Sequence, residues 1–347
     1  MREREKDIVT VGGGTGSPIV NRALLLAGVP HINAIAAMYD NGGYTGKRRL
    51  LDETGKEVAY SDALRIMCSL IDPNNRNQRQ KAEVITEWFT FKNGNGEVPG
   101  YGLAHNWFDS QKGLEKLQRD VNKLGIRLMG QVLPSSTESA HIKFTTMLGN
   151  TYSGEALLDE QEKSTDMVIS MVLEPTVSAF LPARKAIEEA QVIFLSCGSL
   201  HGSVLCNFLP DGMKDSIAKS KAKVYVITNL VSNRNETHEF SPRDYIRVVE
   251  EYIGNGRIDG IIVPDISRFE FESRDPQTTI LYAQEESSHF LGWEQEELHK
   301  VQKEGIQIIT HRATDVVVVP ASKSEKEKRI IRHNPEKLKD ALEDLIK

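Results

Sequence analysis

A short apolar run that ends in a cluster of glycines constrains the fold of this chain more than any other feature. Residues 8–11 read Ile-Val-Thr-Val, which favours a buried parallel strand. Five residues then form a turn: Gly12, Gly13, Gly14, Thr15 and Gly16. Glycine allows such a turn to bring its backbone close to a ligand. The apolar run at 19–26 predicts a helix after the turn, with Ser17 as its N-cap and Pro18 in its first turn.

A strand, a glycine turn and a helix in this order favour a phosphate-binding site. The N–H groups of the helix N-terminus and the positive end of the helix dipole face the point where the turn lies. The alternative is a turn that only connects the strand to the helix. The run also departs from the dinucleotide-binding pattern G-x-G-x-x-G, because Ser17 stands where a third small residue is expected.

Size and charge limit the classes of protein to consider. The 347 residues suffice for one large core or two domains, and the net charge of −6 argues against nucleic-acid or membrane-surface binding. The three cysteines lack metal-ligand spacing, which indicates a reducing compartment. No stretch approaches the roughly 20 apolar residues of a membrane span, and the charged N-terminus does not resemble a signal peptide. We expect a cytoplasmic α/β protein.

Segments that predict strands alternate with segments that predict helices along the chain. Strands are expected at 32–38, 131–134, 192–196, 223–228, 259–263 and 307–310. Helices are expected at 60–70, with Ser61 or Asp62 as the N-cap, at 183–190 and at 335–346. This alternation predicts a three-layer, doubly wound, mostly parallel Rossmann-like sheet.

Three other segments complete the predicted organisation. Residues 72–125 have helical periodicity and form a helical insertion, and residues 142–173 contain alternating segments that predict a small antiparallel β element. A basic segment and a helix occupy about 323–347, and a solvated tail is the simplest interpretation of the basic run. We expect one domain over residues 1–347.

A second glycine-rich loop follows the strand expected at 32–38. It contains Asp40, Asn41, Gly42 and Gly43 at the carboxyl end of a strand, where open α/β sheets bind ligands. Asp40 also lies near the position of the ribose-binding acid in dinucleotide enzymes. Together with Asp62 these side chains fit a Mg²⁺ site, because Mg²⁺ takes one or two carboxylates along with water and phosphate. Helix capping is the alternative role for Asp62.

The loop after the strand at 192–196 reads Cys-Gly-Ser-Leu-His-Gly-Ser. It loosely matches G-x-S-x-G, but His201 stands where the second glycine belongs, so a nucleophilic Ser199 is disfavoured. Small residues and hydroxyls after a strand fit a phosphate or sugar contact better. Cys197 is expected to be a small core residue, and His201 a contact or structural residue. Asn229, at the end of the next strand, could bind a base or sugar or act as a cap.

Five segments in this order resemble one superfamily: VGGGTGSPIV (11–20), YDNGGYTGKRR (39–49), SDALRIMCSL (61–70), GQVLPSSTES (130–139) and the stretch from Cys197 to Leu230. The superfamily contains the bacterial gluconeogenesis factors (YvcK) and the 2-phospho-L-lactate transferases (CofD). The loop at 40–46 and the ET-x-x-F segment at 236–240 are more similar to the gluconeogenesis factors. The G-D-D loop of the transferases is absent, and Asn41 replaces a second acid.

The resemblance implies a nucleotide or UDP-sugar site at the strand ends. By motif match the turn at 13–16 would hold phosphate, with Asp40 and Asn41 beside it, and Asp62 would correspond to the acid used with Mg²⁺. The opposite wall would contain Gly198, Ser199, Leu200 and Asn229. Tyr282 and Arg332 resemble the tyrosine and arginine that bind UDP-sugars in the gluconeogenesis factor branch.

We therefore expect a cytoplasmic UDP-sugar-binding regulator linked to carbon metabolism and cell envelope synthesis. It would form a homo-oligomer and act on a protein partner through a surface that changes when the ligand binds, and no catalytic residue is assigned. The alternative is a Mg²⁺-dependent transferase of the 2-phospho-L-lactate type, in which Asp40 and Asp62 hold the metal. An NAD(P)-dependent oxidoreductase is less favoured, because it rests on the first glycine turn and Asp40 alone.

Overall fold

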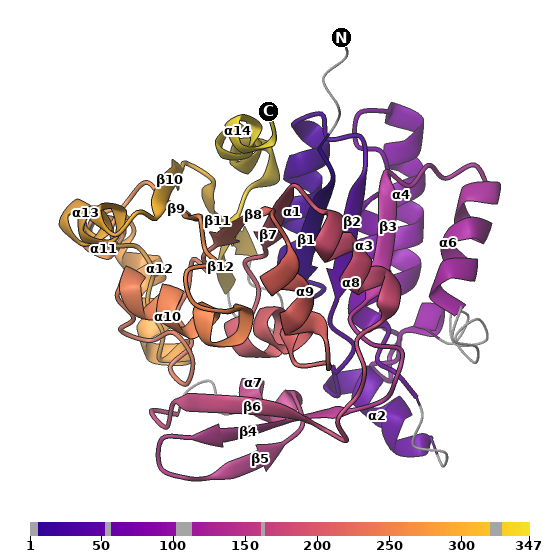
Figure 1. Ribbon diagram of the computed structural model, residues 1–347, viewed down its shortest axis with the longest axis horizontal. Helices are drawn as coiled ribbons and strands as arrows, with labels where there is room; N and C mark the ends of the chain where they lie inside the picture. The colour runs from indigo at the N-terminus through magenta and orange to yellow at the C-terminus, as the bar shows by residue number, and fades with distance from the viewer. Residues whose placement is uncertain (1–5, 53–56, 102–112, 161–163, 320–327) are drawn as a thin grey trace.

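The computed structural model describes residues 6–52, 57–101, 113–160, 164–319 and 328–347, and a parallel sheet forms its centre (Figure 1). The sheet has seven strands in the order β10-β9-β8-β7-β1-β2-β3, and every neighbouring pair is parallel. The strands are β1 (Ile8–Gly12), β2 (Ile32–Ala36), β3 (Gly130–Pro134), β7 (Val192–Leu195), β8 (Lys223–Ile227), β9 (Gly260–Pro264) and β10 (Gln307–His311). The predicted parallel α/β sheet is confirmed.

The strand order reverses between β1 and β7. From β1 the chain adds β2 and β3 on one side, and it later adds β8, β9 and β10 beyond β7 on the other side. The backbone N–H of Ser196, just after β7, donates to the carbonyl of Val11 in β1. Open α/β sheets bind ligands outside the carboxyl ends of the strands at such a reversal. The turn after β1 and the loop after β7 therefore begin side by side at the expected ligand position.

Helices cover both faces of the sheet. On one side α1 (Gly16–Leu26) packs against α3 (Ser61–Ser69) and α14 (Pro335–Ile346). A second group contains α8 (Leu181–Glu189), α9 (Met213–Lys219) and α10 (Pro242–Ile253), and the sheet lies between the two groups (Figure 1). This is the predicted three-layer, doubly wound arrangement, and α14 has the bounds expected from the sequence.

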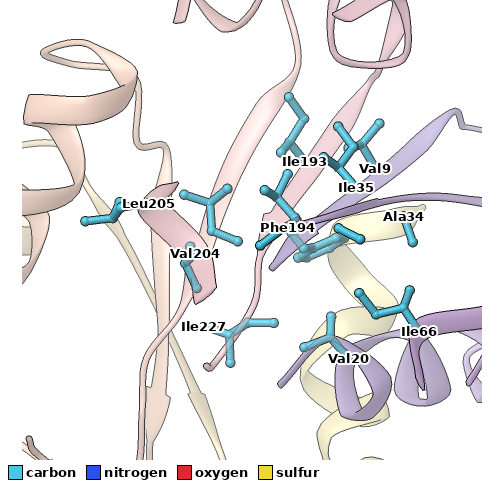
Figure 2. Close-up of a cluster of buried hydrophobic side chains, with 14 of the residues drawn as sticks. Val9, Val20, Ala34, Ile35, Ile66, Ile193, Phe194, Val204, Leu205 and Ile227 are labelled. Carbon is cyan, nitrogen blue, oxygen red and sulfur yellow. The ribbon is translucent and has the colours of Figure 1, made fainter. Parts of the chain in front are cut away.

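The strands form the core because both of their faces are covered. Val9, Ile35 and Phe194, from three neighbouring strands, are fully buried. Figure 2 shows them in one cluster with Val20 of α1 and Ile66 of α3. β-Branched and aromatic side chains on continuous runs thus explain why these segments are central strands.

The insertion and the small β element also agree with the sequence. The described part of 72–125 contains α4 (Arg76–Thr90) and α6 (Gly113–Lys123), while residues 102–112 lie outside the described residues. An antiparallel sheet in the order β5-β4-β6 lies beside the central sheet (Figure 1). Its strands are β4 (His141–Thr146), β5 (Thr151–Ser153) and β6 (Val168–Glu174).

The basic segment near the C-terminus is not a tail in its described part. Here β12 (Lys328–His333) pairs antiparallel with β11 (Thr314–Val319), and residues 323–327 lie outside the described residues. The remaining elements are α2 (Gly43–Leu51), α7 (Ala156–Glu160), η1 (Leu200–Val204), η2 (Leu205–Phe208), α11 (Arg268–Arg274), α12 (Pro276–Leu281), η3 (Tyr282–Glu286) and α13 (Gln295–Lys303). None of the helices described is both long and apolar enough to cross a bilayer.

The predicted N-caps of α1 and α3 are wrong. Thr15 occupies the N-cap position of α1, and Ser17 lies inside its first turn, where its hydroxyl donates to Oγ of Ser196 at 3.1 Å. Tyr60 occupies the N-cap position of α3, and Ser61 donates to the carboxylate of Asp40 at 2.7 Å. Both serines contact another loop instead of their own helix.

Candidate functional site

A cavity of about 550 Å³ opens at the carboxyl ends of the strands on both sides of the reversal. Its lining comes from the loops after β1, β2, β7 and β8, from α3, and from β12. The lining residues named in the sequence analysis are Gly14, Thr15, Gly16, Asp40, Gly42, Gly43, Asp62, Gly198, Ser199, Asn229 and Arg332. Segments far apart in the sequence therefore meet around one space.

The first glycine turn forms one wall and the N-terminus of α1. A Cβ added to Gly16 would lie 2.6 Å from the backbone nitrogen of Gly198, and one added to Gly14 would lie 3.0 Å from Cα of Asp62. Only glycine allows this approach of the turn to its neighbours. Among the described residues no side chain caps the start of α1. The N–H of Ser17 donates to the carbonyl of Gly13 at 3.2 Å, and the positive end of the α1 dipole at this turn suits an anion in the cavity.

Gly12 and Gly13 lie behind this wall and do not line the cavity. A Cβ on Gly12 would lie 2.6 Å from Oγ of Ser17, and a Cβ on Gly13 would lie 2.7 Å from Oγ of Ser203. These two glycines allow the strand end to pack tightly against serine side chains. Their part in the site is therefore to place the turn.

Asp40 organises the second glycine loop. One of its carboxylate oxygens accepts the N–H of Gly42 at 2.8 Å, and the other accepts the hydroxyl of Ser61. Asn41 is directed elsewhere, since its Oδ1 accepts the N–H of Ala156 at 2.7 Å and the residue is not part of the lining. The loop therefore presents Asp40 to the cavity and uses Asn41 to hold α7.

Arg49, which the sequence analysis did not select, fixes the same loop from behind. Its guanidinium donates to the carbonyls of Tyr39 and Asp40 and, at 2.7 Å, to the carbonyl of Ala140. Burial lowers the pKa of Arg49, while the negative charge of Asp40 acts to raise it. The contacts join the loop after β2 to the chain beyond β3.

Charges of both signs face the cavity. The basic side chains are Arg65, Lys92 and Arg332, and the acidic ones are Asp40, Asp62 and Glu155. The guanidinium of Arg65 lies 4.0 Å from the carboxylate of Asp62, one helical turn away. Asp62 also lies directly against Gly13 and Gly14, where an anion would bind. Asp40 and Asp62 line the same cavity, and carboxylates are among the ligands that Mg²⁺ prefers, so these residues are of the type that would hold this cation.

A buried ionic network supports the opposite wall. The hydroxyl of Ser199 donates to the carboxylate of Glu236, which also accepts the backbone N–H of His201 at 2.9 Å. Nδ1 of His201 lies 3.3 Å from the same carboxylate, and Glu236 is 1% exposed. Burial acts to raise the pKa of Glu236, but the contacts with His201 and Ser199 outweigh it and keep the pKa below its usual value. The wall is thus held by an ionised glutamate.

This network disfavours nucleophilic chemistry in the loop, as the sequence indicated. Ser199 donates to Glu236 and not to His201, so the histidine is not placed to accept its proton. Burial raises the pKa of the Cys197 thiol to about 12, which keeps it protonated. Leu200 is fully buried below the wall, and the amide of Asn229 donates to the carbonyl of Gly198 at 2.8 Å.

The hairpin of β11 and β12 closes the cavity. It contributes Ile331, Arg332 and His333 to the lining. Tyr282 does not line this cavity but a neighbouring one of about 300 Å³, which shares Val231 and Asn233 with it. The hydroxyl of Tyr282 accepts the N–H of Ile331 at 3.0 Å. Tyr282 therefore contacts the strand that contains Arg332, but it lines the neighbouring cavity.

The family model for the 2-phospho-L-lactate transferase CofD matches residues 8–314. The chain belongs to the CofD family. It is 28% identical over 267 residues to a gluconeogenesis factor of Listeria innocua, covering 76% of this chain and 78% of that protein. It is 24% identical over 344 residues to a putative gluconeogenesis factor of Thermotoga maritima, covering 97% and 98%. The resemblance to the gluconeogenesis factor branch of the CofD family is confirmed.

A solved structure agrees with the fold of this CofD family chain. The crystal structure of a UPF0052 family member from Bacillus halodurans aligns with a TM-score of 0.75 at 23% identity, covering 98% of this chain and 99% of that one. The two chains therefore share the central sheet and its helices over nearly their full lengths.

The motifs did not identify every residue that lines the cavity. Arg65 could have been found, because it follows Asp62 by three residues and so lies on the same face of α3. Lys92 and Tyr101 come from the insertion, and Glu155 lies between β5 and α7; the positions of these segments at the cavity depend on tertiary packing. Most of the motif residues line this one cavity. The exceptions are Gly12, Gly13, Asn41, Leu200 and Tyr282, which do not line it.

Proposed function

We propose that this member of the CofD family is a nucleotide-sugar-binding regulator of the gluconeogenesis factor type, linked to carbon metabolism and cell envelope synthesis. The observation that carries the proposal is the cavity between the uncapped N-terminus of α1 and Arg332. A helix N-terminus and an arginine facing one space suit a diphosphate. The volume lies within the range of about 300–1,000 Å³ of small-molecule sites.

The neighbouring cavity lends further support. Val231 and Asn233 line both cavities, and Tyr282 lines the second one. An elongated ligand that starts at the glycine turn would pass Arg332 and extend into the second cavity. The relatives from Listeria innocua and Thermotoga maritima are called gluconeogenesis factor and putative gluconeogenesis factor, which supports a protein of the gluconeogenesis factor type.

Calorimetric titration with UDP-N-acetylglucosamine, with and without Mg²⁺, tests the proposal. We expect one-site binding that leaves the ligand intact. Arg332→Ala should weaken it about 10-fold to 100-fold, because a charge-assisted hydrogen bond contributes about 1.5–3 kcal/mol. Arg312→Ala is the matched control, since Arg312 is exposed and lies outside the cavity. No binding by the wild-type protein, or equal affinity of the two variants, would contradict the proposal.

A Mg²⁺-dependent transferase is the second candidate, and the position of Asp62 favours it. This carboxylate lies against the turn that would hold phosphate, where a negative charge would repel the ligand unless a cation lay between them. Asp40 and Asp62 would hold the ion, which would neutralise charge on the transferred group.

The two candidates differ in their dependence on Mg²⁺. For a transferase, GDP should bind only with Mg²⁺, and Asp40→Asn should abolish turnover while leaving the fold intact, because the amide oxygen can still accept the N–H of Gly42. For a regulator, Asp40→Asn should change the affinity for the UDP-sugar only a few-fold. Phosphorus NMR of the ligand after incubation separates the two outcomes.

A further inference from the structure

Two histidines and a glutamate form a cluster outside the cavity described above. Among the residues that the structure describes, His238, Glu239 and His289 are the group whose ligand atoms meet within 4.8 Å of one another. Nε2 of His238 lies 3.5 Å from Oε1 of Glu239, and Nδ1 of His289 lies 3.9 Å from the same oxygen. Ligands of a tetrahedral Zn²⁺ lie roughly 3.3 Å apart, given bonds of about 2.0–2.1 Å. The two distances to Glu239 are close to this spacing, and the three ligand atoms, all within 4.8 Å of one another, would contract around an ion.

A buried hydroxyl holds both imidazoles in place. Oγ of Ser232 lies 3.3 Å from Nδ1 of His238 and 3.2 Å from Nδ1 of His289, and it also accepts the backbone N–H of His289. An antiparallel bridge between Val231 and Phe290 joins the two segments next to this contact. Histidines that bind metals are commonly oriented by such a hydrogen bond to a neighbouring group. The contact leaves Nε2 of His238 as its ligand atom. Nδ1 of His289, which lies 3.9 Å from Glu239, has to exchange its contact with Ser232 for the ion.

The cluster offers donor types that transition metals bind, namely two imidazoles and one carboxylate. Arg268 donates to Glu239 at 3.1 Å, so an ion would share this carboxylate with the guanidinium.

The cluster also faces open space. A cavity of about 420 Å³ is lined by Glu239 and His289 together with Arg268 and Glu272. It has room for a water molecule or an anionic ligand to complete the coordination of an ion. Two nitrogen donors and one carboxylate suit Zn²⁺, whereas Mg²⁺ and Ca²⁺ prefer oxygen ligands. Glu239 is the one carboxylate of the cluster, and Arg268 also donates to it. An ion that needs several oxygen ligands is therefore further disfavoured.

We propose that His238, Glu239 and His289 bind a transition metal ion of the Zn²⁺ type, with a fourth coordination position open to the cavity beside them. The ion joins the loop after β8 to the segment before α13. Val231 and Asn233, which flank Ser232, line the nucleotide cavity, so the ion stabilises one wall of that cavity. Metal binding at this cluster does not depend on which ligand occupies the neighbouring cavity.

The test uses untagged full-length protein that has been treated with a chelator and then dialysed against Zn²⁺. We expect about one Zn²⁺ per chain by elemental mass spectrometry, and visible d–d absorption bands of a four-coordinate ion when Co²⁺ replaces Zn²⁺. Glu239→Gln and His238→Ala should each weaken binding about 10-fold or more. Glu239 is 66% exposed in its side chain, so its substitution should not impair folding.

Two control variants make the result specific. Glu272→Gln removes the charge of a carboxylate that lines the same cavity and accepts a hydrogen bond from Arg268. His299→Ala removes an exposed histidine outside the cluster. Both should bind Zn²⁺ like the wild-type protein. The proposal is overturned if the wild-type protein retains no Zn²⁺, or if Glu239→Gln and His238→Ala retain as much as these controls. Neither measurement involves a nucleotide, so the outcome is independent of the proposed function.

Discussion

At Gly14 the lack of a side chain lets the turn after β1 lie directly on Asp62. A Cβ here would collide with a carboxylate oxygen of Asp62 and approach its Cα to 3.0 Å. Gly14→Val should therefore displace either the turn or α3 and weaken nucleotide binding about 10-fold or more, which corresponds to about 1.4 kcal/mol. Calorimetric titration measures this loss.

Gly94→Ala is the matched control for this substitution. A Cβ on Gly94 meets no described atom within 4 Å, and the residue does not line the cavity. The control should bind like the wild-type protein. Equal affinities of Gly14→Val and the wild-type protein would rule out a role for this turn in holding the ligand.

Single residues were predicted well where the motif fixes the backbone and less well where a side chain has several partners to choose from. The glycine turn was predicted to approach a ligand, and the close approach that the structure shows at Gly16 is to the backbone of Gly198. Ser17 was assigned to capping because serine prefers that position, yet its hydroxyl contacts Ser196 across the strand reversal. A sequence pattern contains the local preference but not the competing tertiary partner.

At the scale of elements, the hairpin of β11 and β12 brings Arg332 to the cavity. Ile331 anchors it in a small apolar cluster with Leu230, Phe271 and Phe290. Ile331→Ala should destabilise the protein by about 2–3 kcal/mol, because it leaves a cavity in this cluster. It should also weaken nucleotide binding by releasing the strand that holds Arg332. Urea denaturation and calorimetric titration measure the two effects.

Val318→Ala gives the comparison on the facing strand of the same hairpin. Val318 is 44% exposed, so its truncation should change stability by no more than about 0.5 kcal/mol. If Ile331→Ala has an equally small effect, the hairpin is not anchored through this cluster.

The hairpin was missed because two signals conflicted in the sequence. Residues 316–319 are four successive valines, a typical strand signal, but the charged run that follows indicated a solvated tail. The structure pairs Val316 with Ile331 and Val318 with Arg329, so the end of the basic run belongs to a strand that also contains Ile330 and Ile331. Charge alone therefore did not identify the environment of this segment.

At the scale of the whole molecule, the sheet could be predicted and the closure of the cavity could not. Continuous apolar runs that end in glycine or polar residues predicted the seven strands and the edge at which open α/β sheets bind ligands. The rest of the lining comes from the segment after α4, from Glu155 after β5 and from β12, which follow one another at intervals of many residues and meet only in the folded chain.

Buried histidines make the stability of the whole fold depend on pH. His333 and His311 lie with ring centroids 4.9 Å apart, and burial lowers the pKa of His333 to about 4 and that of His311 to about 3. Both pKa values are below the unfolded value of 6.5, so the unfolded chain binds protons first as the pH falls. The stabilisation by the neutral histidines is therefore complete above about pH 6.5 and is lost as the pH falls toward 4, by up to about 1.4 kcal/mol per pH unit for each residue.

Urea denaturation with EDTA at about pH 7.5 and about pH 5.5 tests this coupling above the range where carboxylates titrate. The wild-type protein should lose stability between the two values, and His333→Gln should lose about 1.4 kcal/mol less, because one proton-linked group is removed. The glutamine amide can still donate to the carbonyl of Thr228, as Nε2 of His333 does. His299→Gln, at an exposed position, should behave like the wild-type protein. The pH dependence of His333→Gln could instead equal that of the wild-type protein. His333 would then keep an ordinary pKa in the folded protein, and its burial in β12 against Thr228 would not disfavour the charged imidazole.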